Sequence, residues 1–184
     1  MNDEKVFSSQ ANIRVYVGDM SKLRDKKVYV YRYNSKLRKV ETLPYSAKYK
    51  VDKDGYLELN VVSGGEYVVL PQAATAKERV ALLEQISVST SKKTLYYKEK
   101  AKNKVQLNIK LPNTLEVTKS YKTKASQSVI GAVQVSFKSQ NTKIAIVDSS
   151  GCITAKSKGT VKILVTVKLY SGKKKTFTTT IKVK

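Results

Sequence analysis

The side chains of this chain that could carry out chemistry are few, and they do not form a catalytic set. The 184 residues contain no histidine and one cysteine, Cys152. Without an imidazole, the Ser-His-Asp and Cys-His arrangements and histidine metal sites are excluded. Cys152 has no base to activate it, and we interpret it as buried packing within a strand. No glycine-rich phosphate loop joins a strand to a helix. The sequence therefore predicts a protein that is not an enzyme and has neither a cofactor nor a metal site.

One aromatic stripe and one acidic turn could bind a ligand. Tyr29, Tyr31 and Tyr33 share one face of a predicted strand, and an exposed stripe of this kind stacks against sugar rings. Packing across strands is the commoner use of such a stripe. Asp52 and Asp54 imitate the start of a calcium loop but lack the other ligands of an EF-hand, so we predict a β-turn there.

The positive charge is concentrated in the second half of the chain. The whole chain has 36 Lys and Arg against 14 Asp and Glu, a net charge of +22. Residues 1–72 have 13 basic and 9 acidic side chains, whereas residues 85–184 have 21 lysines, no arginine and 3 acidic side chains. These lysines are either solvated outer faces that protect strand edges or a field that attracts polyanions such as wall polymers and acidic glycans. A predicted turn near the C-terminus is the preferred place for a weak anionic contact, through Lys173, Lys174 and Lys175.

The charge also raises the question of nucleic-acid binding. A pI near 9.9 is typical of such proteins. However, residues 85–184 lack arginine, which forms the best bidentate contacts with phosphate and guanine. Their aromatic residues are not spaced like a base-stacking platform. The sequence therefore disfavours a nucleic-acid partner.

Length and composition limit the number of domains and the class of protein. A chain of this length with 41% hydrophobic residues is sufficient for one large or two small domains. No apolar run is long enough to span a bilayer, and the N-terminus shows no basic region followed by an apolar stretch, so neither a transmembrane segment nor a signal peptide is predicted. If the protein is secreted, we expect the chain to be part of a longer multidomain protein.

Strict alternation of apolar and polar residues predicts strands in the second half. In the stretch 104–111, Val105, Leu107, Ile109 and Leu111 share one face and polar side chains share the other. The same alternation recurs at 133–137, 161–169 and 177–183. Two facing apolar surfaces of this kind predict a β-sandwich.

A further motif connects these strands and carries a family resemblance. The stretch 139–159 reads as strand, turn, strand and turn. It resembles the core signature of the bacterial immunoglobulin-like domain, group 2, at Ser139, Asn141, Ile144, Ala145, Val147, Asp148, Gly151, Ile153, Thr154, Ala155 and Gly159. The resemblance covers about residues 86–184. It implies an all-β immunoglobulin-like β-sandwich in which these eleven residues are structural.

The β-rich runs of the first half predict a second, smaller all-β domain. Short β-rich runs lie at 13–17, 27–33, 37–42, 47–51, 56–61 and 66–70. They resemble, loosely, the small β-rich modules of surface proteins of Gram-positive bacteria. We predict a domain at 1–71, a linker or short helix at 72–85 and the sandwich at 86–184. Thr75 and Glu78 have the spacing of a helix cap in the linker.

The resemblance implies a non-catalytic extracellular module of a bacterial cell-surface or secreted protein that acts in adhesion, in recognition or as a structural spacer. Its expected partners are cell-wall polyanions, glycans or a host surface protein. The alternative is an ancillary carbohydrate-binding or wall-anchoring module of a larger glycan-degrading enzyme. A basic nucleic-acid binder is the third and least supported interpretation.

Overall fold

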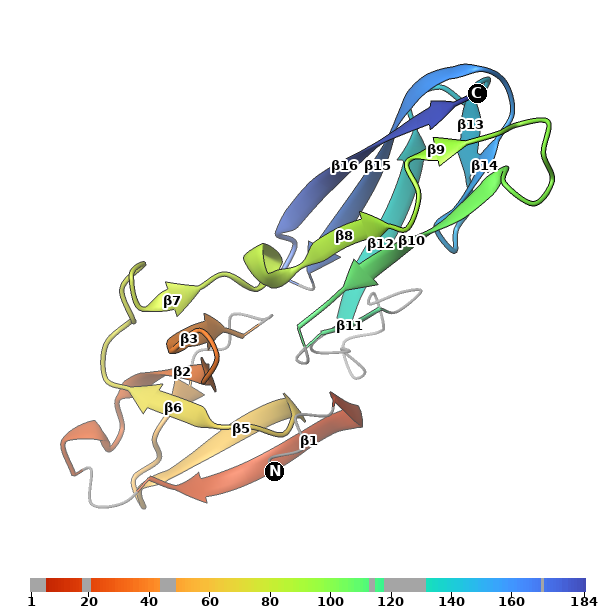
Figure 1. Cartoon of the computed structure of the whole chain (residues 1–184). Helices are drawn as coiled ribbons and strands as arrows, with labels where there is room; N and C mark the ends of the chain where they lie inside the picture. Colours follow the sequence, from red (N-terminus) through yellow and green to blue (C-terminus); the bar gives the residue numbers. More distant parts are fainter. Residues whose placement is uncertain (1–5, 18–20, 44–48, 113–114, 118–131, 170) are drawn as a thin grey trace.

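The computed structural model describes residues 6–17, 21–43, 49–112, 115–117, 132–169 and 171–184. Strands dominate these residues, and the short helices among them are two 3-10 turns, η1 (Ser21–Leu23) and η2 (Leu82–Gln85). Figure 1 shows an elongated arrangement, with the strands of the first half at one end and those of the second half at the other. No helix in the described ranges has the length and apolar character needed to cross a membrane.

The first half contains a two-stranded and a five-stranded sheet. The seven strands are β1 (Val6–Tyr16), β2 (Lys27–Asn34), β3 (Lys39–Thr42), β4 (Tyr49–Lys50), β5 (Tyr56–Ser63), β6 (Tyr67–Leu70) and β7 (Arg79–Val80). β1 pairs with β5 alone, and β2 is the centre of the other sheet, with β3, β4 and β6 as antiparallel neighbours. Valines of β2 pack against Leu57, Leu59 and Val61 of β5, so the two sheets enclose one core.

These strands lie where the alternation predicts them, to within a few residues at most ends. β1 begins earlier than the predicted run at 13–17, and residues 47 and 48 of the fourth run lie outside the described residues. The predicted turn at Asp52 is confirmed, because its carboxylate Oδ1 accepts the backbone N–H groups of Asp54 and Tyr56 at 2.9 and 2.8 Å. An aspartate that accepts its own turn's amides needs no bound cation to hold this shape.

The segment between the halves is attached to both. The N–H of Thr75 donates to Glu78 Oε2 at 2.6 Å, in a turn that leads into β7 rather than into an α-helix. β7 pairs in parallel with β3 of the first half. Two residues later η2 buries Leu82 in a cluster with Val133, Val167 and Leu169 of the second half.

The second half is a two-layer sandwich of one antiparallel sheet and one mixed sheet whose two edge strands pair in parallel. Its strands are β8 (Ser87–Thr90), β9 (Thr94–Leu95), β10 (Lys104–Lys110), β11 (Glu116–Val117), β12 (Ala132–Ser139), β13 (Ala145–Val147), β14 (Cys152–Ala155), β15 (Gly159–Leu169) and β16 (Lys174–Val183). One sheet has the order β13-β14-β10-β8 and the other has the order β11-β12-β15-β16-β9. Both sheets contribute to one core, in which Ile153 faces Ile163 and Ile181 in the same cluster.

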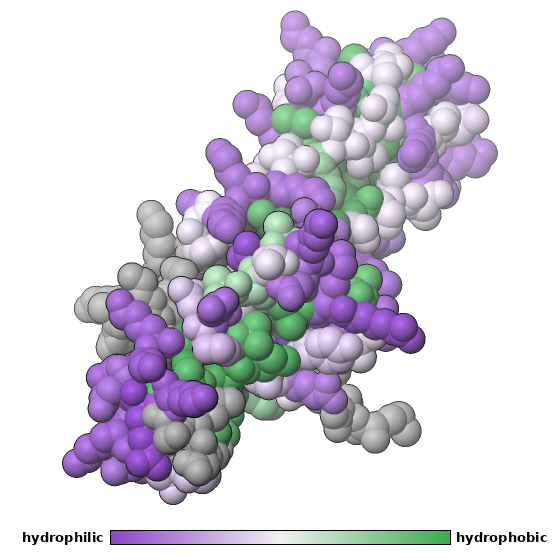
Figure 2. Space-filling model, turned by 90° about the vertical axis from the view of Figure 1, so that its left-hand side faces the viewer, coloured by the Kyte–Doolittle hydropathy of each residue, from purple (hydrophilic) through white to green (hydrophobic). Residues whose placement is uncertain are grey.

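The predicted alternation is confirmed in this sandwich. Every second side chain of β15 from Val161 to Leu169 is buried, and the last residues of β16 bury Ile181 and Val183. Apolar burial of this kind contributes roughly 25 cal/mol per Å² removed from water, which is why the register is set by the apolar face. Figure 2 shows the result from outside: hydrophilic side chains project around the end of the molecule that holds the sandwich.

Candidate functional site

The eleven residues of the family signature at 139–159 lie in the β13–β14 hairpin and in the segments next to it. Asp148 Oδ1 accepts the N–H groups of Ser150 and Cys152 at 2.9 and 3.0 Å, and Gly151 takes a positive φ of 84°. These donors lower the pKa of the Asp148 carboxyl, the Ser150 hydroxyl contributing most. Behind the hairpin, the Ser139 hydroxyl donates to the carbonyl of Ala145 at 2.7 Å. All of these contacts are internal to the fold.

The predicted tyrosine stripe is split between surface and interior. Tyr29 is 45% exposed, whereas Tyr31 is 5% exposed and its hydroxyl accepts the N–H of Ala74 at 3.0 Å. Tyr33 is half-buried. The contact of Tyr31 with Ala74 joins residues that lie 43 positions apart in the sequence, so no local pattern indicates it. The three rings therefore do not present one continuous exposed platform.

The three lysines of the predicted turn have different surroundings. Lys173 and Lys174 are exposed. Lys175 is half-buried, and its Nζ donates to the backbone carbonyl of Leu83 at 3.2 Å and lies 5.0 Å from the centre of the Phe177 ring. Lys173 also lines a small apolar hollow of about 130 Å³ beside Leu43 and Leu83. Lys175 thus contacts the segment that joins the two halves.

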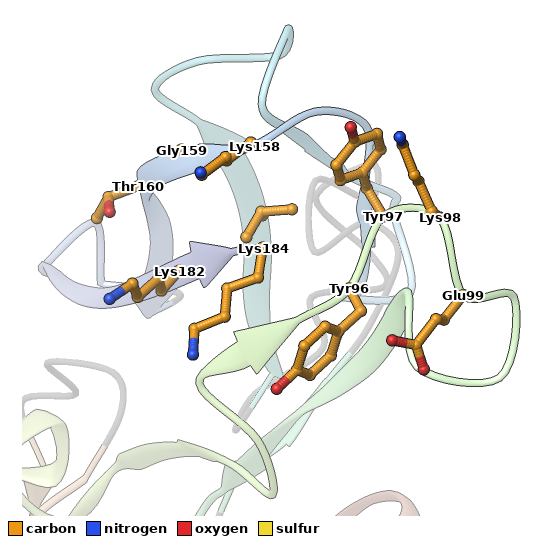
Figure 3. Close-up of a pocket in the computed structure, with 10 residues that line it drawn as sticks. Tyr96, Tyr97, Lys98, Glu99, Lys158, Gly159, Thr160, Lys182 and Lys184 are labelled. Carbon is orange, nitrogen blue, oxygen red and sulfur yellow. The ribbon is translucent and has the colours of Figure 1, made fainter.

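A hollow of about 680 Å³ lies at the end of the sandwich, and we refer to it as the tip hollow. Its lining comes from the loop after β9, the start of β15 and the end of β16: Tyr96, Tyr97, Lys98, Glu99, Lys158, Gly159, Thr160, Lys182, Val183 and Lys184. Figure 3 shows lysines of β16 and of the turn before β15 on one side, and the two tyrosines with Lys98 and Glu99 on the other.

Backbone hydrogen bonds join the two walls of the tip hollow. Lys184 N–H donates to the carbonyl of Leu95 at 2.9 Å, and Tyr97 N–H donates back to the carbonyl of Lys184 at 3.2 Å. These bonds continue the parallel pairing of β9 with β16. The tyrosines are therefore placed by backbone bonds to a strand that lies more than eighty residues later in the chain.

The charge in the tip hollow is strongly positive. Glu99 accepts a hydrogen bond from Lys102 Nζ at 2.8 Å, which raises the pKa of Lys102 and balances the carboxylate. Lys98, Lys158, Lys182 and Lys184 remain as four ammonium groups around the lining. Ammonium groups also lie over the rings, with Lys98 Nζ 5.7 Å from the centre of Tyr97 and Lys102 Nζ 5.5 Å from the centre of Tyr96.

This arrangement is suited to binding an anionic ligand. Ammonium groups attract anions, and phenol rings pack against flat apolar faces while their hydroxyls form hydrogen bonds. Cys152, which the sequence predicted to be buried, is only half-buried, because it lies at the start of β14 next to the hairpin turn. Within the described residues, no three His, Cys, Asp or Glu side chains come together as metal ligands.

The sequence did not predict the tip hollow. Its residues lie in three stretches around 96–99, 158–160 and 182–184, and only the first has a local signal, the adjacent pair Tyr96 and Tyr97 next to a lysine. The sequence also did not predict the buried ion pair between Arg32 and Glu41, whose side chains are 3% and 1% exposed. Each of these groupings depends on which strands become neighbours.

Comparison with known proteins finds a family match for part of the sandwich. Residues 119–168 match the family model described as intimin, immunoglobulin-like domain. No curated protein is similar enough to match the chain. Among solved structures, the chain is similar to the crystal structure of a C-terminal 282-residue fragment of intimin in complex with the intimin-binding domain of the translocated intimin receptor (Tir). That similarity has 19% sequence identity and a TM-score of 0.28, and it covers 96% of this chain and 60% of that one.

At these values the solved structure assigns neither a family nor a partner to this chain. The family match is more specific, although it covers 50 of the 184 residues. It falls on a part of the chain that includes β12, β13, β14 and most of β15. Together with the two-layer arrangement of the strands, it confirms the predicted fold class: the protein is all-β and contains an immunoglobulin-like β-sandwich.

Proposed function

We propose that this chain is a non-catalytic, adhesion-type module of a bacterial cell-surface or secreted protein, and that its tip hollow contacts anionic polymers. The observation that carries the proposal is the set of four ammonium groups around two tyrosines at the end of the sandwich. Four exposed lysines in the lining of one hollow give a denser positive field than lysines spread along solvated strands. The family match at 119–168 supports the adhesion-type role, because the model describes a domain of intimin.

The finer assignments are part of the same proposal. The signature at 139–159 supports membership of the group 2 bacterial immunoglobulin-like domains and an extracellular placement. We also propose two domains, at 1–71 and 86–184, joined by residues 72–85. The separation of the sheets on either side of residues 81–86 supports this division. We also propose a host surface protein as a partner of this module and an origin in Gram-positive bacteria.

The alternative function, carbohydrate binding or wall anchoring within a larger glycan-degrading enzyme, has less support in its predicted form. An exposed tyrosine stripe would favour it, whereas Tyr31 is buried with its hydroxyl bonded to the main chain. Tyr29 is the member of the stripe that offers an exposed ring. Nucleic-acid binding gains no support from the tip hollow, because its cations are all lysines.

The test is a binding titration with two matched variants. In the first, Lys98, Lys158, Lys182 and Lys184 are all changed to Gln. The control carries the same change at four exposed strand lysines of the sandwich, Lys104, Lys110, Lys138 and Lys162. Both variants lose four charges, so they differ only in where the charges were. Teichoic acid, heparin, duplex DNA and a neutral wall polysaccharide are titrated at 20 and 150 mM NaCl.

We expect the tip variant to bind teichoic acid or heparin about tenfold more weakly at 150 mM NaCl, and the control to change by about threefold or less. An equal loss in both variants would show that the lysines act as a non-specific field, and the module would then be a spacer. Tighter binding of DNA than of the other polyanions, retained at 150 mM NaCl, would favour the nucleic-acid interpretation instead.

A further inference from the structure

The outer face of the β1–β5 ribbon carries three cross-strand pairs of polar or aromatic side chains. The register pairs Asn12 with Asn60, Arg14 with Glu58, and Tyr16 with Tyr56. Partners in an antiparallel pair lie on the same face, and residues two apart share that face, so all six side chains point the same way. We refer to these six residues as the polar ladder. Figure 1 shows the two strands side by side at the end of the molecule opposite the sandwich.

The polar ladder faces solvent, and the opposite face of β5 holds the core, whereas Ile13 and Val15 on that face of β1 are each 38% exposed. Leu57, Leu59 and Val61 of β5 alternate with the ladder residues and are buried. Asn12, Arg14 and Glu58 are exposed. An apolar face inward and a polar face outward is the usual pattern of an antiparallel ribbon. What is unusual here is that the outward face is hollowed.

The hollow over the polar ladder has a volume of about 780 Å³. Five of the six ladder residues line it, all except Tyr16, and the strand β4 and the turn after it close one side with Tyr49, Lys50 and Asp52. This volume is within the range of small-molecule sites, which place a few polar groups around aromatic or apolar walls.

The central side chains are held in place before any ligand arrives. The Arg14 guanidinium donates to Asp52 Oδ2 at 2.9 Å and lies 4.1 Å from the centre of the Tyr56 ring. The Tyr16 and Tyr56 rings are tilted by 56° with centres 5.2 Å apart. The hydrogen bond from Arg14 lowers the pKa of the Asp52 carboxyl. Side chains that are already ordered lose less conformational entropy when a ligand binds.

The charges around this hollow balance, which separates it from the tip hollow. The lining has two basic side chains, Arg14 and Lys50, and two acidic ones, Asp52 and Glu58, and Lys50 Nζ is paired with Asp25 outside the lining at 2.8 Å. The lining also contains the amides of Asn12 and Asn60, a side-chain type that both donates and accepts hydrogen bonds. A sugar ring has neighbouring hydroxyl groups and an apolar face. Amides, carboxylates and a guanidinium can form hydrogen bonds with those hydroxyls, and a tyrosine ring can pack against the apolar face. A site with balanced charge does not favour an ion.

We propose that the polar ladder binds an uncharged saccharide, with its hydroxyls on Asn12, Asn60 and Glu58 and its ring against Tyr56. Arg14 supplies further donors from its fixed position between Asp52 and the ring. The site differs from the tip hollow in place, in charge and in ligand class. It also uses none of the predicted stripe at Tyr29, Tyr31 and Tyr33.

The test is titration of the whole chain with soluble neutral polysaccharides, namely a linear β-glucan, a mannan, a galactan and an oligomer of N-acetylglucosamine, at 0.15 and 1 M NaCl. Tyr56→Ala removes the aromatic wall, and Glu58→Ala removes an exposed acceptor with little risk to the fold. Glu66→Ala is the matched control, because Glu66 is exposed in the same half and lies outside the hollow. Circular dichroism checks that each variant is folded.

We expect saturable binding to at least one of the four polysaccharides that persists at 1 M NaCl. Tyr56→Ala and Glu58→Ala should weaken it about tenfold, and Glu66→Ala should leave it unchanged. The proposal is overturned if none of the four polysaccharides binds, if binding disappears at 1 M NaCl, or if a folded Glu58→Ala variant binds like the Glu66→Ala control. These outcomes are independent of the polyanion titration, which concerns the tip hollow.

Discussion

Lys175 Nζ donates a hydrogen bond to the backbone carbonyl of Leu83 at 3.2 Å, across 92 residues of sequence. The bond connects the last strand of the sandwich to η2, in the segment that joins the two halves. The same segment is bonded to the first half, where Asn34 Nδ2 donates to Gln85 Oε1 at 3.4 Å. Residues 79–86 therefore act as a connection with partners on both sides rather than as a free tether.

Replacing Lys175 should destabilise the protein more than replacing its neighbour. Lys175→Ala removes the donor to the Leu83 carbonyl, and we expect a loss of about 1 kcal/mol in the free energy of unfolding. Lys174→Ala removes the same charge from an exposed position and should change it by about 0.5 kcal/mol or less. Urea unfolding of the two variants measures the difference. Equal effects would mean that the bond to Leu83 contributes nothing.

The turn glycines should differ in their tolerance of alanine. Gly151 and Gly172 both have positive φ, 84° and 88°, so each substitution strains the backbone by about 1 kcal/mol. A Cβ on Gly151 would also lie 2.9 Å from the ring of Phe137, whereas nothing lies within 4 Å of one on Gly172. We expect Gly151→Ala to cost about 1–3 kcal/mol more than Gly172→Ala, because the ring must move. Thermal unfolding of both variants tests this, and an equal loss would contradict the close contact.

The Asp148 carboxyl should make stability depend on pH in the acid range. Its pKa is lowered in the folded protein by the donors of Ser150 and Cys152, so the unfolded chain binds its proton first as the pH falls. The stabilisation is therefore present above the ordinary aspartate pKa near 4 and is lost as the pH falls through the lower, folded value. Asp148→Asn keeps an acceptor and cannot titrate. We expect a smaller loss of stability between pH 5 and pH 2.5 in this variant, measured by urea unfolding at each pH. Parallel curves would contradict the assignment.

The buried pair Arg32 and Glu41 should be sensitive to the loss of one partner. Their side chains are almost fully buried, with Nη1 and Oε2 3.4 Å apart, and Asn34 also donates to the carboxylate. Arg32→Met leaves a buried carboxylate without its cation, and we expect a loss of about 3–5 kcal/mol. The double variant with Glu41→Met should be more stable than the sum of the two single changes, because no charge is then left alone. Additive effects in the double-mutant cycle would refute the coupling.

Several elements of the fold could be read from local pattern. The strands β10, β15 and β16 alternate so strictly that their inward faces are unambiguous, and the register of a half-buried strand follows its apolar side. The Asp148 and Asp52 turns were also predictable, because an aspartate followed by glycine three residues later forms its bonds within a few residues. The residue types and the absence of histidine were enough to argue against the usual catalytic sets.

The candidate sites depend instead on contacts between distant segments. Tyr31 belongs to the same alternating stripe as Tyr29, yet it is buried and its hydroxyl is bonded to the backbone of Ala74, 43 residues later. The tip hollow exists because β9 pairs with β16, and the polar ladder because β1 pairs with β5. A period of two residues determines which side chains share a face of one strand. It does not determine which strand lies alongside or what covers the face, because those choices are made by the packing of the whole chain.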